Sequence, residues 1–408
     1  MKQRWIIVLC LWFSLPVLKA DFIGYQIDNQ LRKTVVPFEL SNNLIIVPVM
    51  LNDSLPMKFI LDTGVRTTLL MDDQPDFLEI SHTRTVQVAG MGNSDAIEAY
   101  IASNISLTLP GISGKGQSLV ILKSPYLNLA SHLGMEVHGI IGYDFFNHFV
   151  VEINYPARKL TIYDPNYFKP SARFHSVPLR LVNDRPYIDA LLEQATLSAL
   201  KGSFLLDTGA SYGLLLEIDD DTAVTLPEKH VPAIVGWGLG GEIEGNIGRL
   251  IKFSIGKFRM KNVLASYITK NVREPESDDQ KRIGSVGGEI LSRFHLILDY
   301  KGGKLYLKKN SQYSRPFEYN LSGLDIIATG ADYTTFKVVH VLDNSPAAIA
   351  GVQSGDILIS VDGKGIGDLS LEELTAMFRK SSVSRIRLIV WRNDQGLIEI
   401  KFRLKRMI

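Results

Sequence analysis

The sequence repeats itself at an interval of 145 residues. An apolar run that ends in Asp-Thr-Gly occurs at Phe59–Gly64 and again at Phe204–Gly209. The same interval relates three further landmarks: Gly142 to Gly287, Asn154–Tyr155 to Asp299–Tyr300, and Lys159–Leu160 to Lys304–Leu305. Gly90–Gly92 also falls within one residue of Gly236–Gly238. Landmarks in register over such a length indicate an internal repeat, so the chain is expected to fold as two related halves.

The repeated tripeptide places one carboxylate in each half, at Asp62 and Asp207. A lone Asp-Thr-Gly is weak evidence, because Asp and Gly are turn residues that commonly end a strand. Two carboxylates held a few ångström apart cannot both stay ionised, so they share a proton. One can then act as a base while the other acts as an acid. We therefore predict that Asp62 and Asp207 are a catalytic pair.

Each half also contains a glycine-bearing segment and a hydrophobic-hydrophobic-Gly strand after its Asp-Thr-Gly. In this order, residues 35–312 resemble the retropepsin/pepsin class of aspartic peptidases. The resemblance implies two lobes in one chain, residues 35–168 and 169–312, each a closed β-barrel half. It also implies that Thr63 and Thr208 hydrogen-bond across the two turns. Gly64 and Gly209 would let the backbone approach the carboxylates without a Cβ in the way.

The glycine-bearing segments are the expected flaps of the two lobes. Glycines supply the mobility of a lid, and one large side chain in each segment could cover substrate. Two ordinary hairpin turns are the alternative interpretation. The flaps and their covering residues are Val88–Asn93 with Met91, and Val235–Gly241 with Trp237.

The turns depart from the pepsin pattern at the residues after each glycine. Pepsins usually have Ser or Thr there, whereas this chain has Val65 and Ala210. Losing a donor to the ionised pair should raise its pKa values, so we predict activity at mildly acidic to neutral pH. Arg66 is a second departure. A cation beside Asp62 would favour ionisation and unbalance the pair, unless it points into the cleft or pairs with an acidic neighbour.

The region after a linker near Asn310–Asn320 has a different pattern. Ser345-Pro346-Ala347, then Ala350-Gly351 and Gly355-Asp356-Ile357-Leu358, resemble a bacterial PDZ domain over residues 318–408. In such domains a peptide adds as a strand beside a carboxylate-binding loop, and a helix forms the other wall of the groove. Ser370 and Glu373 make a capping box for that helix, expected at Leu371–Arg379. The resemblance assigns the loop to Gly323, Leu324, Asp325 and Ile326.

Short runs rich in Val, Ile, Leu and Phe, bounded by turn residues, dominate residues 44–307. The predicted fold class is therefore mainly β. The two resemblances imply the architecture: bilobal pepsin/retropepsin-like closed β-barrel halves followed by a PDZ domain, a small β-barrel with two helices. The polar run Arg273–Arg282 is expected to be a solvated loop of the second lobe, with a regulatory or cleavable loop as the alternative.

Residues 1–20 resemble a secretory signal peptide. Lys2 and Arg4 precede the apolar stretch Trp5–Leu15, and Ala20 marks a plausible cleavage point. Pro16 interrupts the stretch, which is short for a membrane span; an uncleaved anchor is the alternative. We therefore expect an exported protein, periplasmic or secreted. Its only cysteine, Cys10, lies in the signal, so the mature chain would have no disulfides.

Composition narrows the function further. Hydrophobic residues make up 46% of the 408 residues, charged residues 21%, and the net charge is +1, without a basic run that would suggest nucleic acid. The eight histidines show no metal-ligand spacing, so no metal or other cofactor is expected.

We expect an exported aspartic endopeptidase with a monomeric catalytic unit. Its partners would be a peptide or protein substrate and, at the PDZ groove, a peptide C-terminus or internal segment. The alternative is a non-catalytic peptide-binding protein that keeps the fold.

Overall fold

The structure is a computed structural model of the chain. It describes residues 22–28, 31–71, 82–88, 90–92, 96–122, 129–195, 199–219, 222–269, 282–380 and 385–408. The predicted signal peptide, and the part of the polar run that ends at residue 281, lie outside these residues.

The first lobe is built around one mixed sheet. Its strands run in the order β1-β9-β6-β10-β5-β4-β8-β7, and β3 pairs with β4. β10 pairs in parallel with β5, placing Ile141 opposite Leu61 at the strand ends. The strands are β1 (Gly24–Ile27), β3 (Glu39–Ser41), β4 (Leu44–Leu51), β5 (Leu55–Leu61), β6 (Leu69–Leu70), β7 (His82–Val88), β8 (Ile97–Leu109), β9 (Ile112–Leu122) and β10 (Gly139–Ile141).

The second lobe repeats this plan. Its strands run β14-β15-β16-β21-β17-β20-β19-β18. β21 pairs in parallel with β16, placing Val286 opposite Leu206, which repeats the first lobe's pairing. The strands are β14 (Arg180–Val182), β15 (Arg185–Glu193), β16 (Leu200–Leu206), β17 (Leu214–Ile218), β18 (His230–Gly238), β19 (Gly241–Ile255), β20 (Phe258–Thr269) and β21 (Arg282–Val286).

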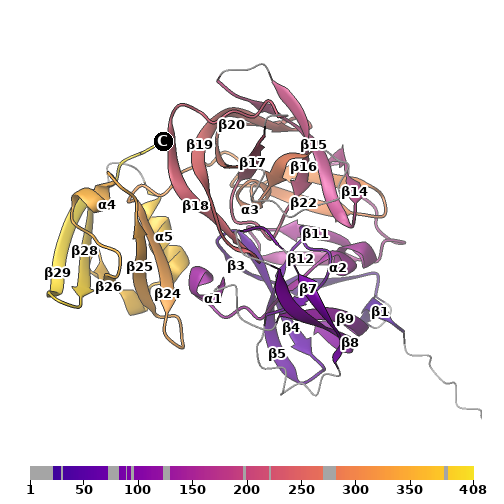
Figure 1. Cartoon of the computed structure of the whole chain (residues 1–408). Helices are drawn as coiled ribbons and strands as arrows, with labels where there is room; N and C mark the ends of the chain where they lie inside the picture. The colour runs from indigo at the N-terminus through magenta and orange to yellow at the C-terminus, as the bar shows by residue number, and fades with distance from the viewer. Residues whose placement is uncertain are drawn as a thin grey trace, which may run out of the picture.

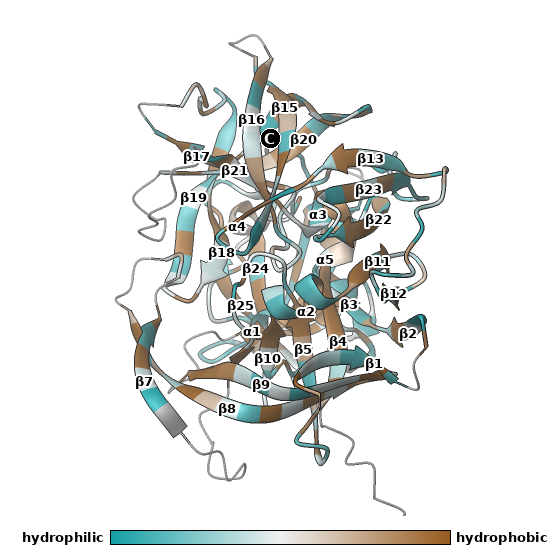
Figure 2. Cartoon of the chain, turned by 90° about the vertical axis from the view of Figure 1, so that its right-hand side faces the viewer, coloured by the Kyte–Doolittle hydropathy of each residue, from teal (hydrophilic) through white to brown (hydrophobic). Residues whose placement is uncertain are grey.

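A third sheet joins the lobes, in the order β13-β23-β22-β11-β12-β2. β11 of the first half pairs with β22 of the second, with Val151 opposite Leu298. One hydrophobic core therefore runs through both lobes. Figure 2 shows hydrophobic residues concentrated along β4, β5 and β10, the strands around the first Asp-Thr-Gly. The strands of this sheet are β2 (Lys33–Pro37), β11 (Val150–Asn154), β12 (Lys159–Tyr163), β13 (His175–Pro178), β22 (Phe294–Asp299) and β23 (Lys304–Lys309).

The C-terminal region has its own sheet and its own core, which includes Phe336, Leu374 and Phe378. Its sheet runs β24-β25-β26-β28-β29, with β27 paired to β26. The predicted capping box is confirmed, because Ser370 and Glu373 bond each other's backbone N–H at the start of α5. The elements are β24 (Leu324–Thr329), β25 (Thr335–Val341), α4 (Pro346–Ile349), β26 (Ile357–Val361), β27 (Lys364–Gly365), the 3-10 helix η4 (Ile366–Asp368), α5 (Leu371–Phe378), β28 (Arg385–Arg392) and β29 (Gly396–Arg403).

Three short helices complete the lobes: α1 (Leu129–Leu133), α2 (Tyr143–His148) and α3 (Gly288–Leu291). Figure 1 shows α1 between the first lobe and the C-terminal region, beside β24 and α5. The predicted mainly β fold class is confirmed, with barrel-like sheets followed by the smaller C-terminal sheet. The lobe and domain boundaries given above stay predictions.

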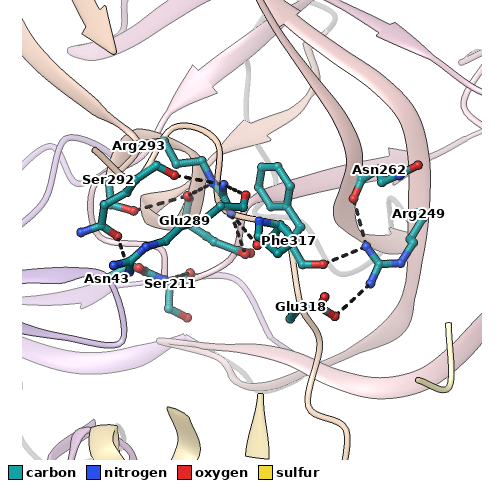
Figure 3. Close-up of polar contacts among 12 residues, drawn as sticks. Asn43, Ser211, Arg249, Asn262, Glu289, Ser292, Arg293, Phe317 and Glu318 are labelled. Atoms are coloured by element: carbon teal, nitrogen blue, oxygen red, sulfur yellow. Dashed lines mark hydrogen bonds and ion pairs between the residues drawn. The ribbon is translucent and has the colours of Figure 1, made fainter. Parts of the chain in front are cut away.

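The segment predicted as a linker is packed against the second lobe. Phe317 is buried in the core shared by the lobes. Arg293 donates to the carbonyls of Arg315 and Pro316, and Arg249 donates to the carbonyl of Phe317 at 2.9 Å. Figure 3 shows these two arginines on either side of Phe317. The C-terminal region is therefore anchored on the second lobe by hydrogen bonds and buried apolar contact.

Candidate active site

Equivalent backbone positions in the two lobes hold the two carboxylates. The Asp62 N–H donates to the Ile141 carbonyl at 2.9 Å, and the Asp207 N–H donates to the Val286 carbonyl at 2.9 Å. Each Asp thus follows an apolar strand and is tied to the parallel strand beside it. The matching strand pairs explain why two sites far apart in sequence present their carboxylates in the same way.

Thr63 and Thr208 connect the two turns through hydrogen bonds in both directions. The Thr63 hydroxyl donates to the Leu206 carbonyl at 2.6 Å, and the Thr208 hydroxyl donates to the Leu61 carbonyl at 2.8 Å. Each hydroxyl oxygen also accepts from the other threonine's N–H, at 3.1 and 3.0 Å. Both side chains are completely buried. A fully satisfied buried network of this kind fixes the relative position of the two turns.

The glycines let the two carboxylates approach the backbone. The Gly64 N–H donates to Asp62 Oδ1 at 2.6 Å, and the Gly209 N–H donates to Asp207 Oδ1 at 3.0 Å. A Cβ added at Gly64 would lie 3.0 Å from Asp207 Oδ1, whereas a Cβ at Gly209 would overlap the Asp62 carboxyl group. The space each glycine leaves is therefore filled by the carboxyl group of the opposite lobe.

Asp62, which is buried, and Asp207, which is half-buried, form a hydrogen-bonded pair. Burial raises the pKa of Asp62 well above its ordinary value, and the charge of Asp207 raises it further. Burial also raises the pKa of Asp207, although hydrogen bonds from Asp62 and Gly209 and nearby cations oppose this. The two groups titrate as a unit. The pair therefore holds one proton into a less acidic range than isolated carboxyls do.

Two arginines that the sequence did not single out act on this pair. The positive charges of Arg282 and Arg185 lower the pKa of Asp207, and Arg185 also lowers that of Asp62. Arg282 is buried and pairs with the buried Glu217 at 2.8 Å. Arg66, by contrast, is exposed and does not line the cavity described below. The cations that act on the pair are therefore Arg185 and Arg282, whereas the role of Arg66 stays open.

The prediction of a solvated loop through Arg282 was also wrong at its last residue. Arg282 begins β21 and is buried, because Glu217 of β17 provides a partner for its charge. Nothing adjacent in sequence signals this partner, which lies 65 residues away.

Tyr212 is another nearby residue that sequence reasoning missed. Its hydroxyl lies 2.9 Å from the Ser285 hydroxyl. Burial raises the pKa of Tyr212 well above its ordinary value, and the charge of Asp207 adds to this. Its position three residues after Gly209 was the one available signal. Tyr212 therefore stays a neutral phenol beside the Asp207 turn.

The two expected flaps meet at their tips. The Gly240 N–H donates to the Met91 carbonyl at 2.9 Å, and Gly92 and Gly240 form a parallel β-bridge. Trp237 stacks on His132 of α1 with ring centroids 3.8 Å apart. Of the first predicted flap, residues 89 and 93 lie outside the described residues. The described residues of the two segments therefore contact each other, and their role as flaps stays a prediction.

A cavity of about 480 Å³ connects these parts. Asp62, Asp207, Met91 and Trp237 all line it. Three of the four predicted PDZ loop residues line it as well: Leu324, Asp325 and Ile326. The fourth, Gly323, has a φ of +82° and no room for a side chain against Ser345. The structure thus brings the predicted site residues of both regions to one cavity, and their individual roles stay predictions.

The described part of the chain contains no group of three or more His, Cys, Asp or Glu side chains that could hold a metal ion. Among the same residues, no helix has the length and apolar character needed to cross a membrane.

The fold and the paired turns resemble those of two-lobed aspartic peptidases, with a smaller appended domain. Residues 47–145 and 194–289 match the aspartyl protease family model, and residues 337–392 match a PDZ domain model. The chain therefore has the architecture of a retropepsin-like aspartyl protease in two segments with a C-terminal PDZ domain, which confirms the predicted resemblance.

One curated relative shares part of the chain. The carboxy-terminal-processing protease of Bartonella bacilliformis is 32% identical over 114 residues. The match covers 28% of this chain and 25% of that protein. The chain thus aligns with about a quarter of its relative's length. Family and relative together support a peptidase with a PDZ domain.

Proposed function

We propose that this protein is an exported aspartic-type endopeptidase that hydrolyses internal peptide bonds and binds part of its peptide or protein substrate through the PDZ domain. The observation that carries this proposal is the hydrogen-bonded carboxyl pair, Asp62 and Asp207. The hydrogen bonds of Thr63 and Thr208 to the opposite lobe fix the two turns that carry this pair. Export rests on the signal-like sequence of residues 1–20.

The mechanism follows from the shared proton. The ionised member of the pair takes a proton from water, which attacks the scissile carbonyl carbon. The protonated member donates its proton to the carbonyl oxygen as the tetrahedral intermediate forms. Collapse of the intermediate breaks the C–N bond. One hydroxyl of the intermediate returns its proton to the ionised carboxyl while the protonated carboxyl gives its proton to the leaving amine, so the pair is again singly protonated. No covalent bond to the enzyme forms, and neither Asp62 nor Asp207 has a fixed role.

The pKa directions support activity at mildly acidic to neutral pH. Burial raises the pKa of both carboxyls, and Val65 and Ala210 provide no hydroxyl donor to the ionised form. The singly protonated pair therefore persists to higher pH than it would with such donors. A rate profile that peaks in the range of gastric pepsins would contradict this proposal.

A second candidate is a non-catalytic peptide-binding protein. Arg185 and Arg282 favour it, because their positive charges stabilise the ionised form of Asp207. A pair with both members ionised has no proton to donate to the substrate carbonyl.

Peptide cleavage by the wild type, Asp62→Asn and Asp207→Asn separates the two candidates. We would incubate each with a pool of peptides and identify the products by mass spectrometry, with a statine-type inhibitor as a control. Each substitution should lower the rate by roughly 10³-fold or more, because neither carboxyl can work alone. The inhibitor should stop wild-type cleavage. Equal rates from all three proteins would rule out the aspartic mechanism.

A further inference from the structure

The groove of the PDZ domain opens into the same cavity as the catalytic pair. The groove lies between β24 and α5. Ile326 and Ile327 of β24 line the cavity that contains Asp62 and Asp207, and Thr375 of α5 lines it from the other side. A peptide bound in the groove would therefore share a continuous space with a peptide bound at the carboxyl pair.

The groove has a strand edge that can accept a peptide. β24 ends the order of its sheet and pairs with β25 on one side within the described residues. An extended peptide can add to such an edge through main-chain hydrogen bonds. At one end the groove is closed by α1, which packs against β24, and by the following Gly134, which sits against Leu371 and Ala328; a Cβ there would lie 2.8 Å from Leu371 Cβ. A peptide can therefore add to β24 only where α1 does not cover its edge. The other end, at Leu324 and Arg379, lines the cavity.

The loop at this open end already has partners for its backbone N–H groups. Asn320 Oδ1 accepts from the N–H of Ser322 at 3.0 Å and from that of Gly323 at 3.3 Å. The Ser322 hydroxyl oxygen accepts from the N–H of Leu324 at 3.2 Å. The Asn320 side chain also donates to the Leu324 carbonyl at 2.6 Å. The amide oxygen of Asn320 thus takes donors that a terminal carboxylate would need.

Charges of both signs lie at this end of the groove. Asp325 of the loop pairs with His340 at 3.2 Å, and Arg379 of α5 lines the same cavity. A terminal carboxylate would be attracted by Arg379 and repelled by Asp325, but it would find few free backbone donors in the loop. The bound chain therefore need not end at the loop and can continue past it into the cavity.

The open end of the groove is held in a fixed position relative to the catalytic lobe. Arg249 donates to the Phe317 carbonyl and lies 4.0 Å from Glu318, as Figure 3 shows. Burial raises the pKa of Glu289 in α3, and the positive charge of Arg379 of the PDZ domain opposes this; both residues line the cavity. The path from the groove to the carboxyl pair should therefore have a constant length.

We propose that one extended polypeptide occupies both regions, with an internal segment added to β24 and an adjoining segment across Asp62 and Asp207. The substrate class is then unfolded or extended polypeptide that is longer than the catalytic cleft alone, recognised without a free C-terminus. This inference rests on the proposed peptidase function. Recognition depends on chain length because the two subsites are joined by one cavity.

The test compares two peptides that share one cleavage sequence found in the peptide-pool experiment. The short peptide has about 8 residues, which span roughly 26 Å when extended, and the long peptide has about 24. Each is made with a free and an amidated C-terminus. Thr375→Trp fills the groove from α5, and Ala376→Trp places the same side chain on an exposed neighbouring position that does not line the cavity.

The wild type should cleave the long peptide at least 10-fold more efficiently than the short one, measured as kcat/KM. Thr375→Trp should remove this preference mainly through KM, whereas Ala376→Trp should keep it. Amidation should change neither result. A length preference that survives Thr375→Trp, no preference at all, or a 10-fold loss on amidation would overturn the inference.

Binding of fluorescent versions of the same peptides separates this inference from the proposed function. If the wild type cleaves neither peptide, the peptidase proposal fails. The shared binding path still stands in that case if the long peptide binds at least 10-fold more tightly and Thr375→Trp removes the difference. Equal affinities for the two lengths would overturn it whether or not cleavage occurs. Arg379→Glu, at the open end of the groove, serves if Thr375→Trp does not fold, and its expected effect is the same.

Discussion

The two lobes carry the same turn in different surroundings. In each lobe the strand before the Asp-Thr-Gly turn pairs in parallel with the same kind of partner strand, and each threonine bonds to the other lobe in the same way. The side chains around the turns do not repeat. Arg282 and Tyr212 of the second lobe correspond to Val137 and Thr67 of the first, 145 residues earlier. The repeated backbone therefore brings Asp62 and Asp207 together, whereas the side chains that differ between the lobes determine how easily each carboxyl ionises.

The largest difference that we expect between the lobes is in the loss of activity when Gly209 or Gly64 is replaced. A Cβ at Gly209 would overlap the Asp62 carboxyl group, whereas one at Gly64 would approach Asp207 at 3.0 Å. Gly209→Ala should lower kcat by roughly 10³-fold, and Gly64→Ala by about 10-fold, because a displacement near 1 Å can cost about 10²-fold. Kinetics on one peptide substrate checks this, with circular dichroism to confirm folding. Equal losses in the two variants would show that the lobes are equivalent at this level.

The second prediction concerns the effect of the Glu217–Arg282 ion pair on stability. The first lobe has Val137 at the position that corresponds to Arg282. Glu217→Ala leaves Arg282 buried without its carboxylate partner and should cost about 3–5 kcal/mol of unfolding free energy. The double variant Glu217→Leu/Arg282→Met, which copies the apolar character of Val137, should recover most of that loss. Urea unfolding measures both. A single variant as stable as the wild type would mean that the pair is not needed to hold β17 and β21 together.

The positions of these charges explain what sequence analysis could and could not predict. The doubled turn, the threonines and the capping box follow from local pattern and spacing, and the structure contains each arrangement. The charges around the pair depend on strands that meet only in the folded protein. Arg282 and Glu217 pair across β21 and β17, while Arg66, adjacent to the turn in sequence, is exposed and does not line the cavity.

Strand boundaries also depend on contacts that are distant in sequence. The sequence has apolar runs at Ile105–Leu109 and Leu250–Ile255, which form only the final parts of β8 and β19. β8 begins at Ile97 and β19 at Gly241, because pairing with neighbouring strands extends both beyond the apolar stretch. Tertiary pairing overrides local composition at these ends. The position of α1 against the PDZ groove likewise had no local signal.

The third prediction concerns the pH dependence of stability. The folded-state pKa of Asp62 is raised well above its ordinary value, so its contribution to stability is present at low pH and is lost as pH rises through the folded pKa. Asp62→Asn removes the titrating carboxyl, so the variant does not lose this stability as the pH rises. The variant should gain Tm relative to the wild type at pH 8 but not at pH 4. The gain for Asp207→Asn should be smaller, because the cations Arg282 and Arg185 oppose the rise of the Asp207 pKa.

Thermal unfolding of the three proteins at both pH values checks this prediction. The same Tm difference at pH 4 and pH 8 would show that the carboxyls are not strained by burial. A larger Tm gain at pH 8 for Asp207→Asn than for Asp62→Asn would contradict the claim that nearby cations act mainly on Asp207.

The smallest expected difference is between the flaps. Trp237 stacks on His132, whereas Met91 contributes its backbone carbonyl to the flap contact. Trp237→Ala should raise KM by about 5- to 10-fold through loss of a stacked aromatic contact, and Met91→Ala by about 2-fold. Steady-state kinetics with the long peptide measures both. A larger effect from Met91→Ala would shift the main substrate cover to the first lobe.

Calorimetric titration with a statine-type transition-state analogue tests the central claim, that one carboxyl from each lobe makes a single site. At mildly acidic pH the wild type should bind one inhibitor per chain, because the inhibitor's hydroxyl needs both carboxyls. Asp62→Asn and Asp207→Asn should each weaken binding by roughly 10²-fold or more, the range over which enzymes prefer transition-state analogues to substrates. Wild-type affinity in either variant, or two inhibitors bound per chain, would contradict a shared pair.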